Sequence, residues 1–374
     1  MSQTFTKALL KMLTAVFVFS VIVASLPATA AESKNSIDDL KKIQNNIREK
    51  DPQKIQSEKL TKKNKDVQVS NQKDLDIEID SSSKQIRVNK KSKGNTTIGI
   101  PGGNLLTDVQ TIDNQVIFSN KNAKFDVIAE VLDGGVRQVI NIKDSSAPTE
   151  YDFPITLESG DKIVVNDDGS VTITAILSDK EKAKREELSK TAPVGVKIPD
   201  FNTKLLIAKP WAKDANRKEL KTSYSVVGSN LRQTIELKDA VFPIVADPIW
   251  CGNTVSSTNR YYNNSSTYPG EYGWSLAVYP SGCGVAGAYM FTTPWSNVWF
   301  SWQDVCNASG TGWYCNYWSN DEYWSMFDQY ACHYNIIGVN KQYVTGSSER
   351  VYNLDIWRPR VSWATMLAKF CNPK

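Results

Sequence analysis

All six cysteines of this 374-residue chain lie beyond position 250, and this uneven placement is the strongest constraint on its fold. Residues 250–374 also hold 10 of the 11 tryptophans, and 27 of these 125 residues are Trp, Tyr or Phe. Residues 31–249 hold only eight aromatic residues. Because small extracellular domains use large rings and disulfides to compensate for a limited core, we expect a separate disulfide-stapled, aromatic-rich domain at 250–374.

The first thirty residues have the three parts of a secretory signal peptide. Lys7 and Lys11 form the basic start, an apolar run follows from Met12 to Leu26, and Ala28-Thr29-Ala30 is a small-residue cleavage site. We therefore expect residues 1–30 to be removed and the mature chain to be secreted into the extracellular space. No later segment reaches the roughly 18 consecutive apolar residues of a membrane-spanning helix, so no transmembrane anchor is expected after cleavage.

An even number of cysteines in an exported chain indicates a disulfide framework, here of three bonds. Six cysteines allow 15 pairings, and the sequence does not choose among them. A metal site is not expected, because no two cysteines have the C-x-x-C spacing and the whole chain has one histidine. No motif points to a cofactor. The predicted disulfide residues are Cys251, Cys283, Cys306, Cys315, Cys332 and Cys371.

The chain before residue 250 divides by composition. Residues 31–73 are rich in Lys, Gln and Asn and have apolar residues at helical spacing only near their start, which predicts a helical, solvated tether. Residues 74–249 contain short apolar runs that alternate with period two, such as Leu75–Ile79, separated by turn signals. Asp167-Asp168-Gly169 predicts one hairpin. An antiparallel β-rich N-terminal domain is therefore expected at 74–249.

Local patterns refine this organisation. Ser178–Lys190 begins with a capping-box signature and has almost no apolar face, which predicts an exposed helix between strands. In the last domain, Ser275–Tyr279 and Asn297–Phe300 are strand-like. A helix is predicted over Ser362–Phe370, with Cys371 stapling its end to the domain. The expected fold class is mainly β or α+β, with an antiparallel β domain in front of a small disulfide-stapled domain.

The charge distribution argues against a nucleic-acid partner. The chain has a formal net charge of +4, but residues 250–374 carry seven basic and seven acidic side chains, which cancel. A domain that binds DNA or RNA by neutralising phosphates needs a basic surface. The positive excess belongs to the leader and the Lys-rich front part instead.

Two parts of the sequence resemble known families. Lys209–Asn216, followed by Phe242–Trp250, looks like the end of an N-terminal β region found on modular secreted Gram-positive proteins. That resemblance implies an export or masking region in front of an exchangeable effector, in some cases a suspected toxin or bacteriocin. Asp328–Tyr334 and Tyr352–Val361, with the final Cys371-Asn372-Pro373, are similar to a bacterial secreted family, domain of unknown function number twenty-five ninety-nine. This second resemblance covers about the last third of the chain and implies no activity.

His333 and Asp328 are the candidate catalytic residues. His333 is the one imidazole of the chain and lies five residues after Asp328, so the two side chains would supply a general base and a carboxylate. The alternative is structural, because His333 directly follows Cys332 and would pack beside a disulfide. We favour this alternative, and a binding function is therefore expected rather than an enzymatic one.

Aromatic side chains that reach the surface are the candidates for a binding face. The run from Trp313 to Trp318 has too many rings in succession for one side of a strand to bury, so both tryptophans are predicted binding residues. Trp357 and Arg358 are further candidates, through a cation–π or anion contact. The alternative for this pair is that Arg358 packs on Trp357 and stiffens the turn before the last helix.

Three functions remain open at this stage. The first is a secreted bacterial effector whose last domain binds a cell-surface or competitor target, with antibacterial or toxin-like action. The second is a non-toxic cell-wall or glycan-binding module. The third is a secreted hydrolase that uses His333 with a nearby carboxylate. We expect the first, because it follows from the modular architecture, and a cell-surface or cell-wall partner serves both of the first two.

Overall fold

The structure of the protein is a computed structural model that covers most of the chain after residue 36. The described residues are 37–50, 57–193, 196–263, 273–286, 295–308, 315, 319–337 and 351–373. The predicted signal peptide at 1–30 and the predicted binding residues Trp313 and Trp318 lie outside this set. Asn35–Lys374 form a single compact unit. The contrast in composition at residue 250 therefore does not divide the chain into two independent bodies.

Strands with alternating apolar residues form the first sheet. In β3 (Leu75–Asp80), Leu75, Ile77 and Ile79 are fully buried and the residues between them are partly exposed, as side-chain alternation along a strand requires. The neighbouring strands pair antiparallel. The described residues contribute eight strands, in the order β1 (Thr61–Lys62), β2 (Val67–Asn71), β3, β4 (Gln85–Lys90), β5 (Gly94–Gly99), β10 (Glu150–Thr156), β16 (Asn230–Ile235) and β15 (Thr222–Val227).

The second sheet is also antiparallel. The predicted hairpin at Asp167-Asp168-Gly169 joins two of its strands, β11 and β12. A short 3₁₀ turn, η1 (Gly103–Leu105), precedes its edge strand β6. In the part of the chain that the structure describes, the main path runs β11 (Lys162–Val165), β12 (Val171–Ile176), β13 (Phe201–Ile207), β18 (Ile249–Cys251), β9 (Gly135–Ile142), β8 (Phe125–Leu132), β7 (Gln115–Ser119) and β6 (Asp108–Ile112), and β14 (Trp211–Lys213) joins through β17 (Ile244–Asp247), which pairs with β9.

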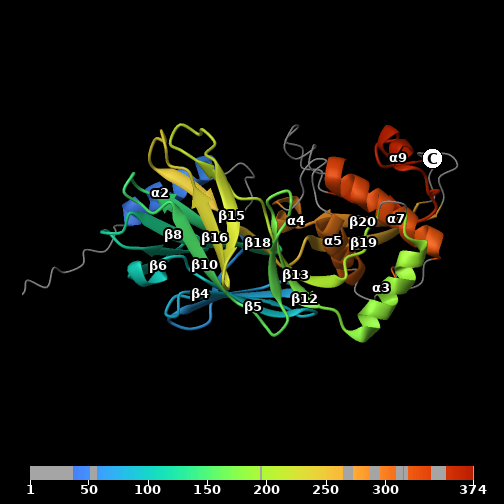
Figure 1. The fold of residues 1–374 in the computed structure, drawn as a ribbon, viewed down its shortest axis with the longest axis horizontal. Coiled ribbons are helices and arrows are strands. Elements are labelled where there is room, and N and C mark those ends of the chain that lie inside the picture. Colours follow the sequence, from blue (N-terminus) through green and yellow to red (C-terminus); the bar gives the residue numbers. More distant parts are fainter. Residues whose placement is uncertain are drawn as a thin grey trace, which may run out of the picture. The chain divides into compact units, whose positions relative to one another are not determined.

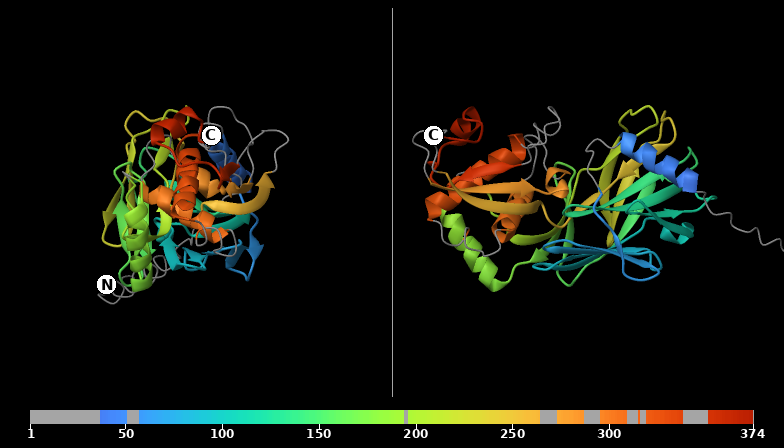
Figure 2. Two further views of the ribbon diagram at one scale, coloured as in Figure 1. Left: turned by 90° about the vertical axis from the view of Figure 1, so that its right-hand side faces the viewer. Right: turned by 180° about the vertical axis from the view of Figure 1, so that it is seen from behind.

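The two sheets enclose one hydrophobic core, and a helix covers the outer face of the second sheet. Val127 of β8 packs in the shared core with Leu75 and Phe153 from the first sheet. Ile128, the next residue, lies in a separate apolar cluster with Ile47 of helix α2 (Ile37–Lys50). Figures 1 and 2 show α2, in blue, against the strands. Because both faces are covered, β8 and β9 are buried along their whole lengths.

The described part of residues 31–73 is not a solvated tether, contrary to our expectation. In α2, Gln44 Nε2 donates a hydrogen bond to Gln115 Oε1 (2.8 Å), and Lys50 Nζ donates to the carbonyl of Pro243 (2.6 Å). Strands β1 and β2 also come from this segment and extend the first sheet. The prediction of a solvated segment rested on its polar composition, but one narrow apolar stripe is sufficient to hold a helix on a sheet. We refer to residues 37–251 as the β region.

Residues 252–373, which we call the C-terminal module, combine a small sheet with helices. Its core packs large rings of α5 and α7 against the sheet, including Trp302, Trp324, Phe327 and Tyr330, all fully buried. The described elements are strands β19 (Val255–Asn263), β20 (Gly273–Pro280) and β21 (Tyr352–Asp355), the helices α4 (Gly282–Ala286), α5 (Trp295–Ala308), α7 (Asn320–Cys332) and α9 (Trp363–Ala368), and the π-helical turn η2 (His333–Ile337).

Helix α3 (Asp179–Thr191) belongs to the β region in sequence but packs against the module. As predicted, it begins with a capping box, in which Ser178 and Glu181 each accept a hydrogen bond from the other's backbone N–H. Its half-buried Leu188 contacts the module core, and Trp324 Nε1 donates to Thr191 Oγ1 (3.0 Å). Figure 1 shows α3 beside the helices of the module. The β region therefore supplies part of the module's packing.

The boundary between β region and module lies later than the expected position 249/250. Trp250 is fully buried in the core between the two large sheets, and its strand β18 pairs with β9 and β13. Beyond this strand, Phe300 of α5 packs in one apolar cluster with Leu206 and Ile249. A buried ion pair joins Lys90 of β4 to Asp304 of α5. The two parts thus share a packed and charged interface.

The chain has three disulfides, as the cysteine count predicted; two lie within the module, and Cys251–Cys283 joins the module to β18 of the β region. The bonds are Cys251–Cys283, Cys306–Cys315 and Cys332–Cys371. The pairing, which the sequence left open among 15 alternatives, joins the cysteines in sequential order. Cys332–Cys371 links the end of α7 to the residues that follow α9, which is the staple expected behind the last helix.

Two of the local predictions for the module were right and one was wrong. Ser275–Tyr279 lies in β20, and the last helix is present as α9 with Ser362 as its N-cap. Asn297–Phe300, however, belongs to helix α5 and not to a strand. A short run of aromatic and branched residues fits a strand or a helix equally well. The 14-residue length of α5 distinguishes a helix, but the four residues considered from the sequence are too few to reveal it.

Candidate functional site

His333, the first candidate catalytic residue, is buried under the small sheet. It begins η2 directly after α7, and its ring stacks on Tyr352 of β21 with 5.6 Å between centroids and 13° between planes. The preceding residue, Cys332, is bonded to Cys371. This placement matches the structural alternative, in which the imidazole packs beside a disulfide.

Asp328, the second candidate, is buried on α7 and faces a cation. Its Oδ2 lies 3.6 Å from Nε of Arg360. Burial raises the pKa of Asp328 to about 6, and Arg360 opposes this shift only in part. Positions five residues apart on an α-helix point about 140° apart around its axis, so the helix does not turn Asp328 and His333 toward one another. The stacking of His333 on Tyr352 and the ion pair of Asp328 with Arg360 favour packing roles for both candidates.

The raised pKa of Asp328 predicts a pH-dependent effect of Asp328→Asn on stability. Between about pH 4 and pH 6 the unfolded carboxyl is ionised and the folded one protonated, so stability falls as pH rises through this window. We expect Asp328→Asn to raise the free energy of unfolding by about 1–2 kcal/mol at pH 8 and to leave it unchanged below pH 4. Urea denaturation at both pH values measures this. Asp321→Asn, an exposed substitution on the same helix, is the control, and an equal effect at both pH values would contradict the assignment.

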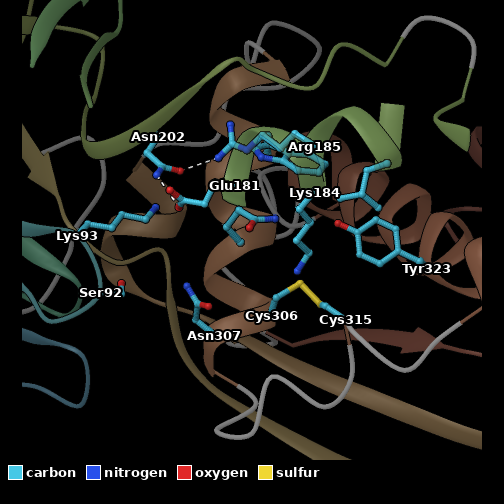
Figure 3. A pocket seen from close by; sticks show the side chains of 13 residues that line it. Ser92, Lys93, Glu181, Lys184, Arg185, Asn202, Cys306, Asn307, Cys315 and Tyr323 are labelled. Carbon is cyan, nitrogen blue, oxygen red and sulfur yellow. Dashed lines mark hydrogen bonds between the residues drawn. A yellow bond between two sulfur atoms is a disulfide. The ribbon is translucent and has the colours of Figure 1, made fainter. Parts of the chain in front are cut away.

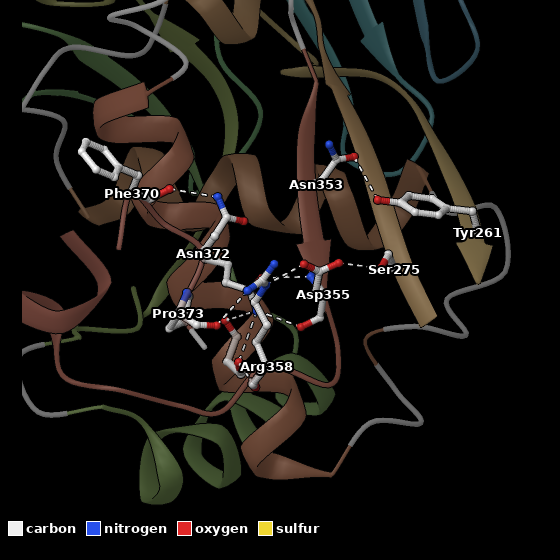
Figure 4. Close-up of polar contacts among 10 residues, drawn as sticks. Tyr261, Ser275, Asn353, Asp355, Arg358, Phe370, Asn372 and Pro373 are labelled. Carbon is white, nitrogen blue, oxygen red and sulfur yellow. Dashed lines mark hydrogen bonds and ion pairs between the residues drawn. The ribbon is translucent and has the colours of Figure 1, made fainter. Parts of the chain in front are cut away.

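Trp357 and Arg358, the predicted binding pair, lie just after β21, where Arg358 is buried and Trp357 is partly exposed. Figure 4 shows Arg358 among its polar partners. The Arg358 guanidinium lies 4.5 Å from the Trp357 ring centroid, its Nε is 2.5 Å from Oδ2 of Asp355, and its Nη1 donates to the carbonyl of Pro373 (2.9 Å). The Trp357 ring packs on Gly273, where an added Cβ would lie 2.5 Å from Trp357 Cδ1. Both side chains thus join the turn to its surroundings, which is the alternative interpretation of this pair.

Asp355 is the centre of this buried polar network. Its carboxylate also accepts a hydrogen bond from Ser275 on the adjacent strand β20. Its backbone exchanges two hydrogen bonds with the side chain of Gln329 on α7, at 2.8 and 3.0 Å. The network therefore joins the edge strand β21 to β20 and to α7. These hydrogen bonds give Asp355 a structural role.

Two exposed aromatic residues contact each other at the end of the same sheet where β19 ends and β20 begins. Tyr262 of β19 and Trp274 of β20 are directly opposed, 53% and 45% exposed, with ring centroids 5.2 Å apart at 81°. The Arg260 guanidinium lies 3.6 Å from the Trp274 ring centroid. We call Arg260, Tyr262 and Trp274 the aromatic surface.

Strand alternation explains why these three side chains share one face. Trp274 follows the same alternation as Leu276 and Val278, which pack in the module core beneath α5 and α7. Trp274 is the second residue of β20, near the end of the sheet, and its side chain is exposed there. We did not predict this surface from the sequence, because it depends on the register that pairs Tyr262 with Trp274. The sequence signal for this surface is a pair of strands, Ser257–Asn263 and Gly273–Tyr279, in the register that the structure shows.

Neither a metal cluster nor a membrane-crossing helix is found in the described ranges. Among these residues, no three His, Cys, Asp or Glu side chains gather closely enough to hold a metal ion. None of the described helices is long and apolar enough to cross a membrane. The six cysteines are all in disulfides, so none is available as a thiol nucleophile.

Comparison with known proteins bears on the last third of the chain. Residues 264–374 match the model of a family described as "Protein of unknown function (DUF2599)". This confirms the resemblance predicted from the Cys-His and Trp-Arg-Pro stretches, and the description names no activity. No curated protein and no solved structure matches the chain. The resemblance of the front part to modular secreted Gram-positive proteins stays a prediction.

Proposed function

We propose that this chain is a secreted bacterial protein whose C-terminal module binds a glycan of a cell surface through the aromatic surface. The observation that carries the proposal is the contacting pair Tyr262 and Trp274, about half exposed in a module whose other large rings mostly fill its core. Contiguous exposed rings are costly to leave in water, and they mark interaction sites.

The geometry of the aromatic surface suits a sugar with acidic groups. Trp and Tyr offer flat apolar faces with polar edges, which complement the apolar face and hydroxyl rim of a pyranose ring. Arg260 stacks on Trp274 and brings a positive charge to the same place. Because neighbouring side chains hold both rings, little conformational entropy is lost on binding. A cell-wall glycan that carries carboxylates is the partner that this chemistry favours.

The other parts of the protein support an extracellular site of action. Three disulfides are typical of an oxidising compartment; two lie within the module that carries the aromatic surface, and the third joins this module to the β region. The antibacterial effector and the non-toxic wall-binding module both need such a contact, so growth inhibition separates them. The hydrolase has less support, because His333 is buried and its ring stacks on Tyr352.

Trp274→Ala tests the proposal. We expect co-sedimentation of the full mature chain with purified peptidoglycan, and an about tenfold weaker affinity for Trp274→Ala, since removing a central interface ring costs about 1–2 kcal/mol. The same preparations are added to growing susceptible bacteria, and inhibition by the wild type alone would favour the effector form. The measurements are a binding isotherm and a growth curve.

Trp363→Ala is the matched control for this experiment. Trp363 is also exposed and in the module, but it lies on α9 against Trp295 and outside the aromatic surface. Thermal unfolding of both variants shows whether the fold is retained. Wall binding that Trp274→Ala leaves unchanged, or that both variants weaken equally, would sink the proposal.

A further inference from the structure

A pocket of about 270 Å³ lies between the β region and the module (Figure 3). Its walls come from the turn between β4 and β5, from α3, and from α5 and α7 of the module. The disulfide Cys306–Cys315 forms one side. A cavity of this size holds a small ligand, and its lining comes from segments that are far apart in the sequence.

The charged side chains that line the pocket are mostly basic. Lys93 comes from the β4–β5 turn, and Lys184 and Arg185 come from α3. Glu181 is the acidic residue among the lining side chains. Its Oε1 accepts a hydrogen bond from Asn202 (2.8 Å) and its Oε2 caps α3 through Ser178, so this carboxylate is already committed. The lining therefore carries an excess of positive charge.

Arg185 is fixed in place by neutral acceptors. Its Nη1 donates to the carbonyls of Pro199 and Phe201 at 2.5 and 2.6 Å, and its Nη2 donates to Oδ1 of Asn202 at 2.6 Å. These bonds orient the guanidinium beside the pocket, as Figure 3 shows, while the carboxylates of Glu181 and Asp200 act on it only as nearby charges. A rigid cation of this kind is pre-organised for an anionic ligand.

Lys93 approaches the pocket from the opposite side and also meets a neutral neighbour. Its ammonium lies 4.4 Å from the ring centroid of Phe300, and in Figure 3 the side chain extends toward Glu181. Lys93 is partly buried, and this desolvation, together with the nearby ammonium of Lys90, lowers its pKa to about 7 against the opposing charges of Asp304 and Glu181. The nearby carboxylates thus only partly offset the cost of the charged lysine, and a bound anion would favour its charged form further.

We propose that this pocket binds a small dianion of the phosphate or sulfate class between Lys93, Lys184 and Arg185. Neutral hydrogen-bonding side chains in the lining, among them Gln303 and Asn307 of α5, complete the contacts around a tetrahedral anion. Because the β region supplies the basic residues and the module supplies the opposite wall, the ligand stabilises the packed arrangement of both. This site is independent of the aromatic surface.

The pH dependence of binding follows from the groups that face Lys93. Lys90 and Arg185 disfavour its charged form, and Asp304 and Glu181 favour it. Lys93 is protonated below about pH 7 and loses its proton above it, so affinity for a dianion is expected to be highest at pH 6 and to fall as pH rises through 7. Sulfate is the suitable probe, because it remains a dianion over this range.

Calorimetric titration of the full mature chain with sodium sulfate at pH 6.0 and 8.5 tests the proposal. We expect saturable binding, about tenfold weaker at the higher pH. Lys93→Gln is expected to weaken binding at pH 6 by about tenfold and to remove the pH dependence. Parallel titrations with inorganic phosphate and with glycerol phosphate at pH 8.5 identify the occupant, since tighter binding of the ester indicates an organic phosphate and equal binding a free anion.

Lys91→Gln is the matched control, because Lys91 is an exposed lysine of the same turn, whose Nζ donates to the carbonyl of Lys73 (3.0 Å). It makes the same change in net charge and is expected to keep wild-type affinity. Thermal unfolding shows that each variant folds, and Lys184→Gln gives a second test from another element. Absence of saturable sulfate binding, or equal weakening by Lys93→Gln and Lys91→Gln, would overturn the proposal.

Discussion

Asp304→Ala is expected to lower the free energy of unfolding by about 3–5 kcal/mol, measured by chemical denaturation of the full chain. The side chains of Lys90 and Asp304 are only 4% and 1% exposed, so the substitution leaves an ammonium group buried without its counter-ion. The carboxylate also accepts two hydrogen bonds from Thr254, from its backbone N–H and its hydroxyl, both at 2.9 Å. Those donors lose their acceptor as well.

Two variants show whether burial is the cause. Glu78→Ala removes a carboxylate whose partners Lys63 and Arg87 are about half exposed, and it is expected to cost less than about 1 kcal/mol. The double variant Lys90→Met/Asp304→Leu removes both buried charges and is expected to recover part of the loss, though not the Thr254 bonds. A loss below about 1 kcal/mol for Asp304→Ala would show that this pair does not hold the interface together.

The same variant bears on the hypothesis that the front of the chain masks an effector. Lys90 belongs to the β region and Asp304 to the module, so Asp304→Ala weakens the packing between them. A masked effector gains growth-inhibiting activity when this packing is weakened. The proposed glycan contact does not need that step, because the aromatic surface is exposed while the two parts are packed together. Wall binding should therefore be the same for folded Asp304→Ala and wild type.

The strands of the β region were predictable because local pattern and tertiary burial agree there. Leu75, Ile77 and Ile79 alternate with acidic residues, and this alternation is what one covered face requires. The cap at Ser178 and the last helix were also readable, since both depend on short-range spacing. The polar front segment was misread, because its packing depends on a sheet face that no local pattern reveals.

The helices and strands of the module were harder to predict, because its many aromatic residues interrupt both the helical and the strand period of apolar residues. In α5, Val298, Trp302 and Val305 do recur at helical spacing on the buried side, but the bulky residues between them resemble a strand. The basic pocket could not be found in the sequence at all. Lys93 and Arg185 belong to separate parts of the β region, and only the packing of α3 on the module brings them to one cavity.

Arg358→Ala is expected to lower the free energy of unfolding by about 3–5 kcal/mol without changing wall binding per folded molecule. The guanidinium is buried and is the cation paired with Asp355, so its removal leaves that carboxylate uncompensated beside Ser275. It also removes a donor to the carbonyl of Pro373 and the contact with Trp357. If Arg358 instead bound the target, stability would change little and binding would fall.

Arg360→Ala is the matched control for this last experiment, because it removes an arginine two residues away whose side chain is 30% exposed. Its pair with Asp328 is long, at 3.6 Å, and we expect a loss of at most about 1 kcal/mol. Arg358→Lys keeps the charge but loses the fork that reaches both Asp355 and Pro373, so an intermediate loss is expected. A ranking of Ala, Lys and wild type at position 358 in stability, with constant wall affinity, assigns this arginine to the fold; the same ranking in wall affinity alone would assign it to the target.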